Sequence, residues 1–496
     1  MRKQEYTTYK LMIEKDGETE GRSMKVKEKK EVKVVHAIVV FAILITAMSC
    51  SIILFDAGVH ISMFIGVCAA ASMALYLGFD WKFIERSMVE GITNALSSLI
   101  ILIVVGILVG VWILSGVVPS MIYYGMKLLS PSVFLIAAVL ICSITSLATG
   151  TSWGTVGTMG LALIGIAIGL GIPAPLAAGA IISGAYFGDK MSPLSDTTYL
   201  APAMAGTDVF THVKFMVFPT GFAYVVTLFI YGVLGMRYGG GGGMNLNAVQ
   251  EMSEGITGIF QVSPLLLLPP VIVILAVAKK VPAIPGITIG IFAGVIMGFI
   301  FQKGITYGDV MIAGMEGYTC ESGIESLDSL LSTGGIVNMM FSVSLTMIAM
   351  MFGGIMEKTG MLAVVVEKIV RIARRPASLV ATTEVTCLLS NIVMPEQYIS
   401  IVIPGRMYAD TYREMGLHPK TLSNALESSG TITSVLVPWN TCAVYVTGVL
   451  GVTTLQYLPY CYFNLSMPLV TILLAFAGVT VAKADETEVR ENIDAE

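Results

Sequence analysis

Four polar segments interrupt otherwise apolar stretches of this chain, and they hold the residue types that could bind a small cation. They cover residues 145–155 (TSLATGTSWGT), 184–198 (GAYFGDKMSPLSDTT), 390–397 (SNIVMPEQ) and 428–441 (SSGTITSVLVPWNT). Glycine and proline break helices there, and an unwound turn at membrane depth is tolerated only around a cavity lined by protein. Freed carbonyls and Ser, Thr and Asn side chains supply the oxygen ligands that hard cations take. The segments therefore predict a cation-binding cavity formed by broken helices.

Asp189 and Asp196 are the strongest candidates for carrying charge in that cavity. An ionised aspartate costs at least about 2.5 kcal/mol at the centre of a membrane helix, so its presence there needs a functional reason. Competition between sodium and a proton for such a carboxylate is the simplest mechanism of antiport. The alternative is that residues 184–198 form an aqueous loop, in which both aspartates are solvated caps or partners of Lys190.

Glu396 carries the corresponding argument in the second pair of segments, where Asn440 stands at the place of Ser195. Glu396 could instead cap a helix or form an ion pair with Arg406. Asp189, Asp196, Thr197 and Asn440 are the predicted sodium ligands. The full set of predicted ion- or proton-binding residues is Asp189, Asp196, Glu396, Ser192, Ser195, Thr197, Thr151, Ser152, Asn391 and Asn440.

A second group of residues could bind an organic substrate. The guanidinium of Arg406 could hold a carboxylate through two parallel hydrogen bonds, and the alternative for it is an interfacial anchor at the start of the polar segment 405–420. Glu427 is a further acid within an apolar segment, and large aromatic side chains could line the cavity. The candidate substrate-binding residues are Arg406, Trp439, Thr149 and Glu427.

The elements that must position these residues are membrane-spanning helices. Of the 496 residues, 55% are hydrophobic and 13% charged, and the mean hydropathy is +0.81; soluble domains carry about 25% charged residues. Apolar runs of about 20 residues match the hydrocarbon thickness, and strand-like alternation is missing from the sequence. The predicted fold class is all-α, a polytopic membrane protein with apolar segments near 34–55, 60–79, 93–117, 132–149, 153–172, 175–187, 211–236, 260–278, 283–301, 336–356, 377–403, 421–450 and 459–482.

Composition divides the chain into five parts. Charged tails at residues 1–33 and 483–496 are predicted to be cytoplasmic. Two transmembrane halves, 34–236 and 262–482, are separated by a linker at 237–261. This linker contains five consecutive glycines and is predicted to be flexible and structureless.

The two halves share a weak internal repeat at an offset of about 245 residues. Near its amino-terminal side the offset falls to 226, so the second copy carries about 19 extra residues around 321–335. Such collinear matches are typical of transporter halves. The matched residues are Gly110 with Gly354, Gly116 with Gly360, Pro131 with Pro376, Gly171 with Gly416, Pro193 with Pro438, and Glu90-Gly91 with Glu316-Gly317.

Basic loops of one copy correspond to loops of the other that are acidic or poor in basic residues. Arg371, Arg374 and Arg375 correspond to a stretch that bears only Lys127. Because Lys and Arg mark cytoplasmic loops, the two copies are predicted to have opposite topologies. With both termini cytoplasmic the pattern is consistent, and inverted repeats favour alternating access with binding near the midplane.

The sequence disfavours several other classes of protein. The seven cysteines show no disulfide or metal spacing. No nucleophile–base pair accompanies the polar segments, so an enzyme is not predicted, and no basic patch indicates nucleic-acid binding. No cofactor is predicted beyond sodium as the transported or coupling ion. The expected partners are sodium, protons and the lipid bilayer, with a small organic anion and a homodimer left open.

Four motifs carry a resemblance to a known family: TGTSWGT (149–155), GDKMSPLSDTT (188–198), QYISIVIPGRM (397–407) and SGTITSVLVPWNT (429–441). They are similar to those of the NhaC family of sodium/proton antiporters, over roughly residues 34–480. The resemblance implies exchange of internal sodium for protons across a prokaryotic plasma membrane, and inverted repeats with re-entrant hairpins. Two positions depart from the family pattern: Glu396 replaces a usual aspartate, and Val435 stands where proline is common.

Three hypotheses on function follow. The first is a secondary active antiporter that exchanges sodium for protons by alternating access. The second keeps the scaffold but carries a small organic acid or an amino acid, because some members of similar sequence exchange malate against lactate with protons and sodium. The third, a passive channel or a sensor, is disfavoured by the inverted repeat.

Overall fold

The protein is described by a computed structural model over residues 30–55, 59–239, 246–279, 281–370 and 373–484. In these ranges the secondary structure is helical, apart from one isolated antiparallel bridge between Leu417 and Lys483. Among the residues that the structure describes, eight helices are long and apolar enough to cross a membrane, or up to eleven if each bent pair is one span. The predicted all-α membrane fold is confirmed.

The first half runs from α2 to α12, and its interior helices end where glycine or proline interrupts them. Pro131 opens α7, where its missing N–H costs no helical hydrogen bond, and Gly150 ends it with a left-handed φ of 71°. The elements are α2 (Val34–Ser49), η1 (Cys50–Leu54), α3 (Val59–Tyr76), α4 (Trp81–Asn94), α5 (Leu96–Leu114), α6 (Val117–Leu128), α7 (Pro131–Thr149), α8 (Ser152–Thr155), η2 (Val156–Gly160), α9 (Leu161–Gly169), α10 (Ala174–Met191), α11 (Asp196–Ala205) and α12 (Val209–Gly239).

The second half repeats this order, with one short helix, α17, inserted in the region of the 19 extra residues. Pro376 opens α20 as Pro131 opens α7. The elements are η3 (Pro264–Leu267), α14 (Leu268–Ala278), α15 (Ala283–Phe301), α16 (Tyr307–Met315), α17 (Glu325–Leu331), α18 (Gly335–Lys358), α19 (Met361–Val370), α20 (Pro376–Val393), α21 (Ile399–Glu414), α22 (Pro419–Leu426), η4 (Glu427–Thr431), η5 (Ser434–Leu436), α23 (Thr441–Leu450), α24 (Thr454–Tyr457), η6 (Leu458–Tyr460) and α25 (Tyr462–Phe476).

The linker differs from its prediction. Its residues 240–245 lie outside the described residues, as do 1–29 and 485–496 of the tails, but Leu246–Ile259 form helix α13. Met252 and Ile256 are buried on one face of α13, and their four-residue spacing is that of an amphipathic helix. The prediction of a structureless linker is therefore wrong for residues 246–259, because burial of this face stabilises a helix.

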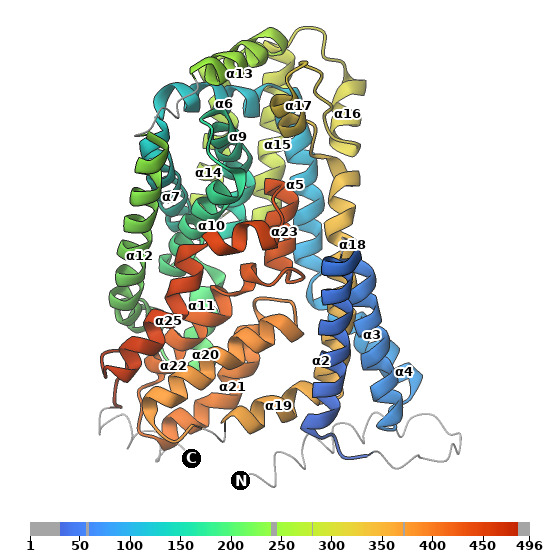
Figure 1. Cartoon of the computed structure of the whole chain (residues 1–496), viewed down its shortest axis with the longest axis vertical. Helices are drawn as coiled ribbons and strands as arrows, with labels where there is room; N and C mark the ends of the chain where they lie inside the picture. Colours follow the sequence, from blue (N-terminus) through green and yellow to red (C-terminus); the bar gives the residue numbers. More distant parts are fainter. Residues whose placement is uncertain (1–29, 56–58, 240–245, 280, 371–372, 485–496) are drawn as a thin grey trace.

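The two copies are related in detail as well as in order. The hydroxyl of Ser146 donates to the Ala185 carbonyl (2.7 Å), and the Asn391 amide donates to the Gly430 carbonyl (2.8 Å). Donor and acceptor are each 245 residues apart between the copies. In Figure 1, α6 and α16 lie near the upper end of the molecule, whereas their equivalents α19 and α4 lie near the lower end. The copies are therefore inverted.

Close glycine contacts join the two copies outside their breaks. A Cβ on Gly354 of α18 would lie 2.1 Å from the Ser87 carbonyl oxygen of α4. A Cβ on Gly110 of α5 would likewise lie 2.1 Å from the Ala313 carbonyl oxygen of α16. Gly354 corresponds to Gly110, and Ser87 corresponds to Ala313, at the offsets of the repeat. Each copy therefore packs its short helix, α4 or α16, against the long helix of the other copy, α18 or α5.

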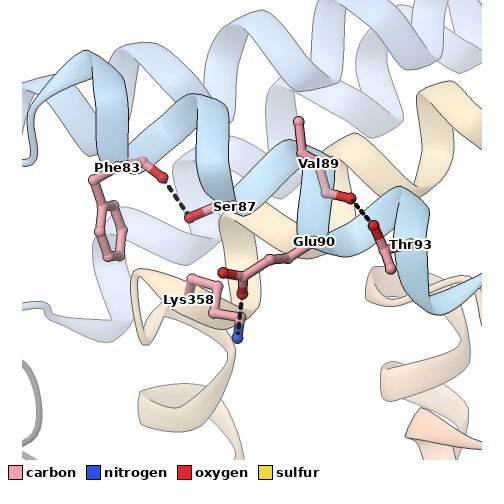
Figure 2. A network of polar contacts seen from close by, with 6 residues as sticks. All are labelled: Phe83, Ser87, Val89, Glu90, Thr93 and Lys358. Atoms are coloured by element: carbon pink, nitrogen blue, oxygen red, sulfur yellow. Dashed lines mark hydrogen bonds and ion pairs between the residues drawn. The ribbon is translucent and has the colours of Figure 1, made fainter.

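An exposed ion pair accompanies the contact between α4 and α18. Glu90 and Lys358 lie 2.7 Å apart, with side chains 45% and 38% exposed (Figure 2). On the same helix the hydroxyls of Ser87 and Thr93 donate to the carbonyls of Phe83 and Val89, each over 2.8 Å. Exposed pairs of this kind contribute about 0–1 kcal/mol, so the glycine packing holds this contact more than the charges do.

All four predicted helix breaks are present. They lie between α7 and α8, between α10 and α11, between α20 and α21, and between η5 and α23. The last break bends its helix pair by 47°. Helix α2 begins and α25 ends at the same end of the molecule (Figure 1), as two termini on one side of a membrane require; which side that is stays a prediction.

Candidate functional site

Three of the four broken segments meet at a cavity of about 440 Å³. The turn between α7 and α8, the turn between α10 and α11, and the turn that precedes α21 supply most of its polar wall. The fourth segment, 428–441, does not line it. Helices α5, α14 and α15 close the remaining sides, and the lining residues from these three helices and the turn before α15 are Ser97, Ser98, Ile101, Val273, Ile274, Val281, Pro282, Ala283 and Ile287.

Asp189 lines this cavity from the last turn of α10 and is 5% exposed. Its Oδ2 accepts a hydrogen bond from the Ser152 hydroxyl at 2.7 Å. Ser152 is the first residue of α8, so this bond joins the two breaks of the first copy. An acid buried beside a cavity, with a hydroxyl partner, is a suitable cation ligand.

Asp196 opens α11 across the second break and is exposed at the cavity. Its neighbours Ser195 and Thr197 are buried, line the same cavity, and join their hydroxyl oxygens over 3.1 Å. The break between Met191 and Asp196 therefore turns one aspartate and two hydroxyls toward the aspartate that precedes it.

Thr149 and Thr151 also line the cavity, on either side of Gly150. The Thr151 side chain caps α8 by accepting from the Gly154 N–H (3.2 Å), and the Thr149 hydroxyl donates to the Thr145 carbonyl (2.9 Å). Trp153 follows on the same wall and stacks on Tyr445, with ring centroids 4.3 Å apart. The stacking anchors the amino-terminal end of α8 to the second copy.

Glu396 reaches the cavity from the second copy and is 3% exposed. Its Oε2 accepts from the backbone N–H groups of Tyr398 (2.6 Å) and Ile399 (3.3 Å), where α21 begins. It is therefore a helix cap and a cavity carboxylate together, because the amino-terminal end of a helix favours negative charge. Gln397 and Tyr398 complete this part of the wall.

Three predicted ligands lie away from the cavity. Asn391 donates to the Gly430 carbonyl and to the Thr433 hydroxyl (3.1 Å), and its Oδ1 accepts from Asn440 (3.1 Å). Asn440 also caps α23 by accepting from the Cys442 N–H (3.1 Å). Both amides therefore stabilise the break of the second copy. The Ser192 hydroxyl donates to the Leu147 carbonyl (2.8 Å) and is likewise used within the protein.

The candidate substrate residues divide in the same way. Thr149 lines the cavity, but Arg406 is exposed on α21 and outside the lining. Trp439 donates to the Ile392 carbonyl at 2.7 Å. Glu427 is fully buried and accepts from the Thr197 hydroxyl at 3.1 Å. Arg406 therefore fits its alternative reading as an anchor rather than a substrate ligand.

Sequence reasoning gave no place in the site to two buried charged residues close to it, and it considered Lys190 only as a possible partner of the aspartates in an aqueous loop. Lys190, next to Asp189, is fully buried and donates to the Ser428 hydroxyl at 3.2 Å. Glu384 on α20 is 2% exposed. The repeat offset could have identified both, because their equivalents in the other copy are Val435 and Val139.

Comparison with known proteins assigns the family. A model of the Na+/H+ antiporter family matches residues 184–479. The chain belongs to this family. The resemblance drawn from the four motifs is confirmed, and the matched range of the Na+/H+ antiporter model includes the break with Asp189 and Asp196 and nearly the whole second copy.

Members of this family that are similar to the chain are named for different activities. The malate-2H+/Na+-lactate antiporter of Bacillus subtilis is 37% identical over 89% of this chain and 94% of that protein. The Na+/H+ antiporter NhaC of Alkalihalophilus pseudofirmus is 34% identical over 90% and 95%. The arginine/ornithine antiporter ArcD of Halobacterium salinarum is 33% identical over 91% and 94%.

Proposed function

We propose that this protein is a secondary active antiporter that exchanges sodium for protons across a prokaryotic plasma membrane, with both termini cytoplasmic. The observation that carries the proposal is the charge of the cavity. Asp189, Asp196 and Glu396 line it, and the described lining residues include no Lys or Arg. Such a cavity attracts monovalent cations. Membership of the Na+/H+ antiporter family supports sodium as that cation.

The cavity residues can perform the exchange by competition. Sodium would take oxygen ligands from Asp189, Asp196 and the hydroxyls of Ser152, Ser195 and Thr197. When sodium leaves, a proton restores the charge balance of the carboxylates. Alternating access then requires the cavity to open to one side at a time, which inverted repeats accomplish by moving one part against the other.

The test is sodium-driven proton flux in proteoliposomes, followed with a pH-sensitive dye. An imposed sodium gradient should move protons in wild type, and Asp196→Asn should abolish this flux because it removes a cavity charge. Glu90→Gln, in the exposed pair of Figure 2, is the matched control and should behave as wild type. Undiminished flux in Asp196→Asn would reject its role, and sodium-independent flux would reject coupling.

An organic cargo is the second candidate, and the size of the cavity favours it. About 440 Å³ is far more than one sodium ion needs and lies in the range of small-molecule pockets, roughly 300–1,000 Å³. Two relatives are named for organic exchange, malate with lactate and arginine with ornithine. Because the described lining bears carboxylates and Arg406 is outside it, an amino acid that presents an ammonium fits better than an organic anion.

The same liposomes separate the two candidates. Sodium alone should drive full proton flux if the first candidate holds. Flux that starts only when an amino acid or a carboxylate is added identifies the second candidate, and the compound that starts it identifies the cargo.

A further inference from the structure

The first turn of the span Ser152–Gly169 contributes directly to the proposed ion site. Ser152 donates to Asp189, and Trp153 lines the cavity. The first turn of any helix is held by fewer internal hydrogen bonds than its middle, and here the π-helical turn η2 separates it from α9. The direction of the Ser152 hydroxyl therefore depends on which other elements hold this turn.

Tyr445 of α23 contacts this turn from the second copy in two ways. Its hydroxyl donates to the Trp153 carbonyl at 2.8 Å, and its ring stacks on the Trp153 indole with the two planes 10° apart. A Cβ on Gly157, in η2, would overlap the same hydroxyl, so this glycine leaves room for it. Tyr445 is fully buried and is not among the described lining residues of the cavity. It is therefore placed to orient this turn rather than to bind an ion.

The helix that carries Tyr445 is fixed to the closed break of the second copy. Asn440 caps α23 by accepting from the Cys442 N–H, and its amide donates to the Asn391 side chain. Tyr445 stands five residues after this cap, near the start of the helix. The bonded amides of the second break are therefore linked through Tyr445 to the ion ligands of the first copy.

The tyrosine is present in one copy only. At the offset of 245 residues, Tyr445 corresponds to Leu200, and Trp153 corresponds to Tyr398. A leucine side chain has no hydrogen-bond donor, so the first copy cannot make the equivalent bond to the Tyr398 carbonyl. One copy of the inverted fold therefore forms without this bond, and the copy that has it places it beside the ion ligands.

We propose that Tyr445 is a positioning residue for the ion site. It holds the carbonyl and the ring of Trp153, and this keeps the neighbouring Ser152 hydroxyl directed at Asp189. The second copy thereby sets the sodium affinity of a site whose ligands come from the first. This role rests on the proposed function, because that function assigns sodium to the site.

The test is the sodium concentration for half-maximal proton flux in proteoliposomes. Tyr445→Phe keeps the stacked ring but removes the hydroxyl, so it should raise this concentration about 2- to 10-fold, as one lost hydrogen bond predicts. Flux at saturating sodium should stay close to wild type. A merely structural role would give the reverse, with less flux at saturating sodium and an unchanged half-maximal concentration.

Tyr457→Phe is the matched control. The Tyr457 hydroxyl is also fully buried and donates to a backbone carbonyl, that of Val435, at the same 2.8 Å. Tyr457 has no printed place at the cavity wall and bonds within the second copy, so its variant should keep the half-maximal concentration of wild type. Size-exclusion chromatography checks that both variants are folded.

A double variant tests whether Tyr445 acts through Ser152. Ser152→Ala should raise the half-maximal concentration by itself, and adding Tyr445→Phe should raise it no further, because residues that act through one contact are not additive. An unchanged concentration in Tyr445→Phe, or a further increase in the double variant, would overturn the positioning role while the proposed function stands. Wild type without sodium-dependent flux would overturn the proposed function, and the role of Tyr445 with it.

A second variant covers the case in which Tyr445→Phe does not fold. Gly157→Ala displaces the same hydroxyl from the other side and should give the same increase in half-maximal concentration. A wild-type concentration in Gly157→Ala would then overturn the inference.

Discussion

The two repeats break their helices at equivalent places but use the breaks for different purposes. In the first repeat, the breaks turn Asp189, Asp196 and the Ser152 hydroxyl toward an open cavity. In the second, the amides of Asn391 and Asn440 bond to each other and to backbone carbonyls, and segment 428–441 is closed. Two copies of one fold can therefore differ in role: the breaks of the first copy supply the proposed ion ligands, and the amides in the breaks of the second copy bond within the protein. Among the described lining residues, Glu396 is the acid that the second repeat adds to the cavity.

The first comparison concerns two lysines that each bond to a residue of the other copy. Lys190→Met should lower the free energy of unfolding by about 1–3 kcal/mol, because it leaves the buried Ser428 hydroxyl without the hydrogen bond from the Lys190 ammonium. Lys358→Met, in the exposed pair of Figure 2, should cost about 0–1 kcal/mol. Thermal unfolding of the purified proteins in sodium-free choline buffer measures both. Equal losses would show that the buried hydrogen bond of Lys190 contributes no more to stability than the exposed ion pair does.

A second comparison uses two glycines with similar left-handed backbones. Gly150 has a φ of 71° and Gly416 a φ of 66°, and alanine is strained at either position by about 1–2 kcal/mol. Only at Gly150 would the new Cβ meet backbone, 2.7 Å from the Leu194 carbonyl carbon. Overpacking there should add about 1–3 kcal/mol.

Function should distinguish these two glycine variants further. Leu194 lines the cavity, so Gly150→Ala should raise the sodium concentration for half-maximal flux in proteoliposomes, whereas Gly416→Ala should leave it unchanged. The same half-maximal concentration in both variants would contradict the direct contact between the two breaks of the first repeat.

The smallest expected effect compares the matched hydrogen bonds of the repeats. Asn391→Ala should destabilise the protein by about 1–3 kcal/mol, since it leaves buried polar groups of the second break with fewer partners. Ser146→Ala removes a single hydroxyl bond and should cost about 1 kcal/mol. Chemical unfolding of both variants checks the order. A larger loss for Ser146→Ala would contradict a framework role for the amides.

The helix breaks could be predicted from the sequence because their causes are local. Glycine, proline and hydroxyl residues at 145–155 and 184–198 interrupt apolar runs, and the structure confirms interruptions there. Asp189, Asp196, Thr151 and Ser152 were predicted from their residue types, and they line the cavity; their role as ion ligands stays a prediction. Helix α13 was not predicted, because the glycine run that precedes it led us to interpret the whole segment as a flexible linker, although its apolar residues have amphipathic spacing.

The direction of the side chains could not be predicted, since it depends on tertiary packing. Asn391 and Asn440 have the right oxygens for a cation, but their amides bond to each other and to the second break instead. Lys190 stands within the motif at 188–198 but was considered only as a partner of the aspartates, and Glu384 is a single charge without a local pattern. The alignment of the copies marks both, through Val435 and Val139. Comparing the two copies position by position therefore finds residues to which the motifs alone assign no role.

The central claim is that the ion site belongs to the first repeat. It is tested most directly by sodium-driven proton flux in proteoliposomes that hold Asp189→Asn or Ser434→Ala, two variants of positions that are equivalent at the repeat offset. The Ser434 hydroxyl donates to the Thr431 carbonyl (2.7 Å), in the closed break. The account predicts that Asp189→Asn loses flux by about 30-fold or more, as expected for a lost charge contact of about 2–5 kcal/mol, while Ser434→Ala stays close to wild type. Equal losses, or flux retained in Asp189→Asn, would contradict it.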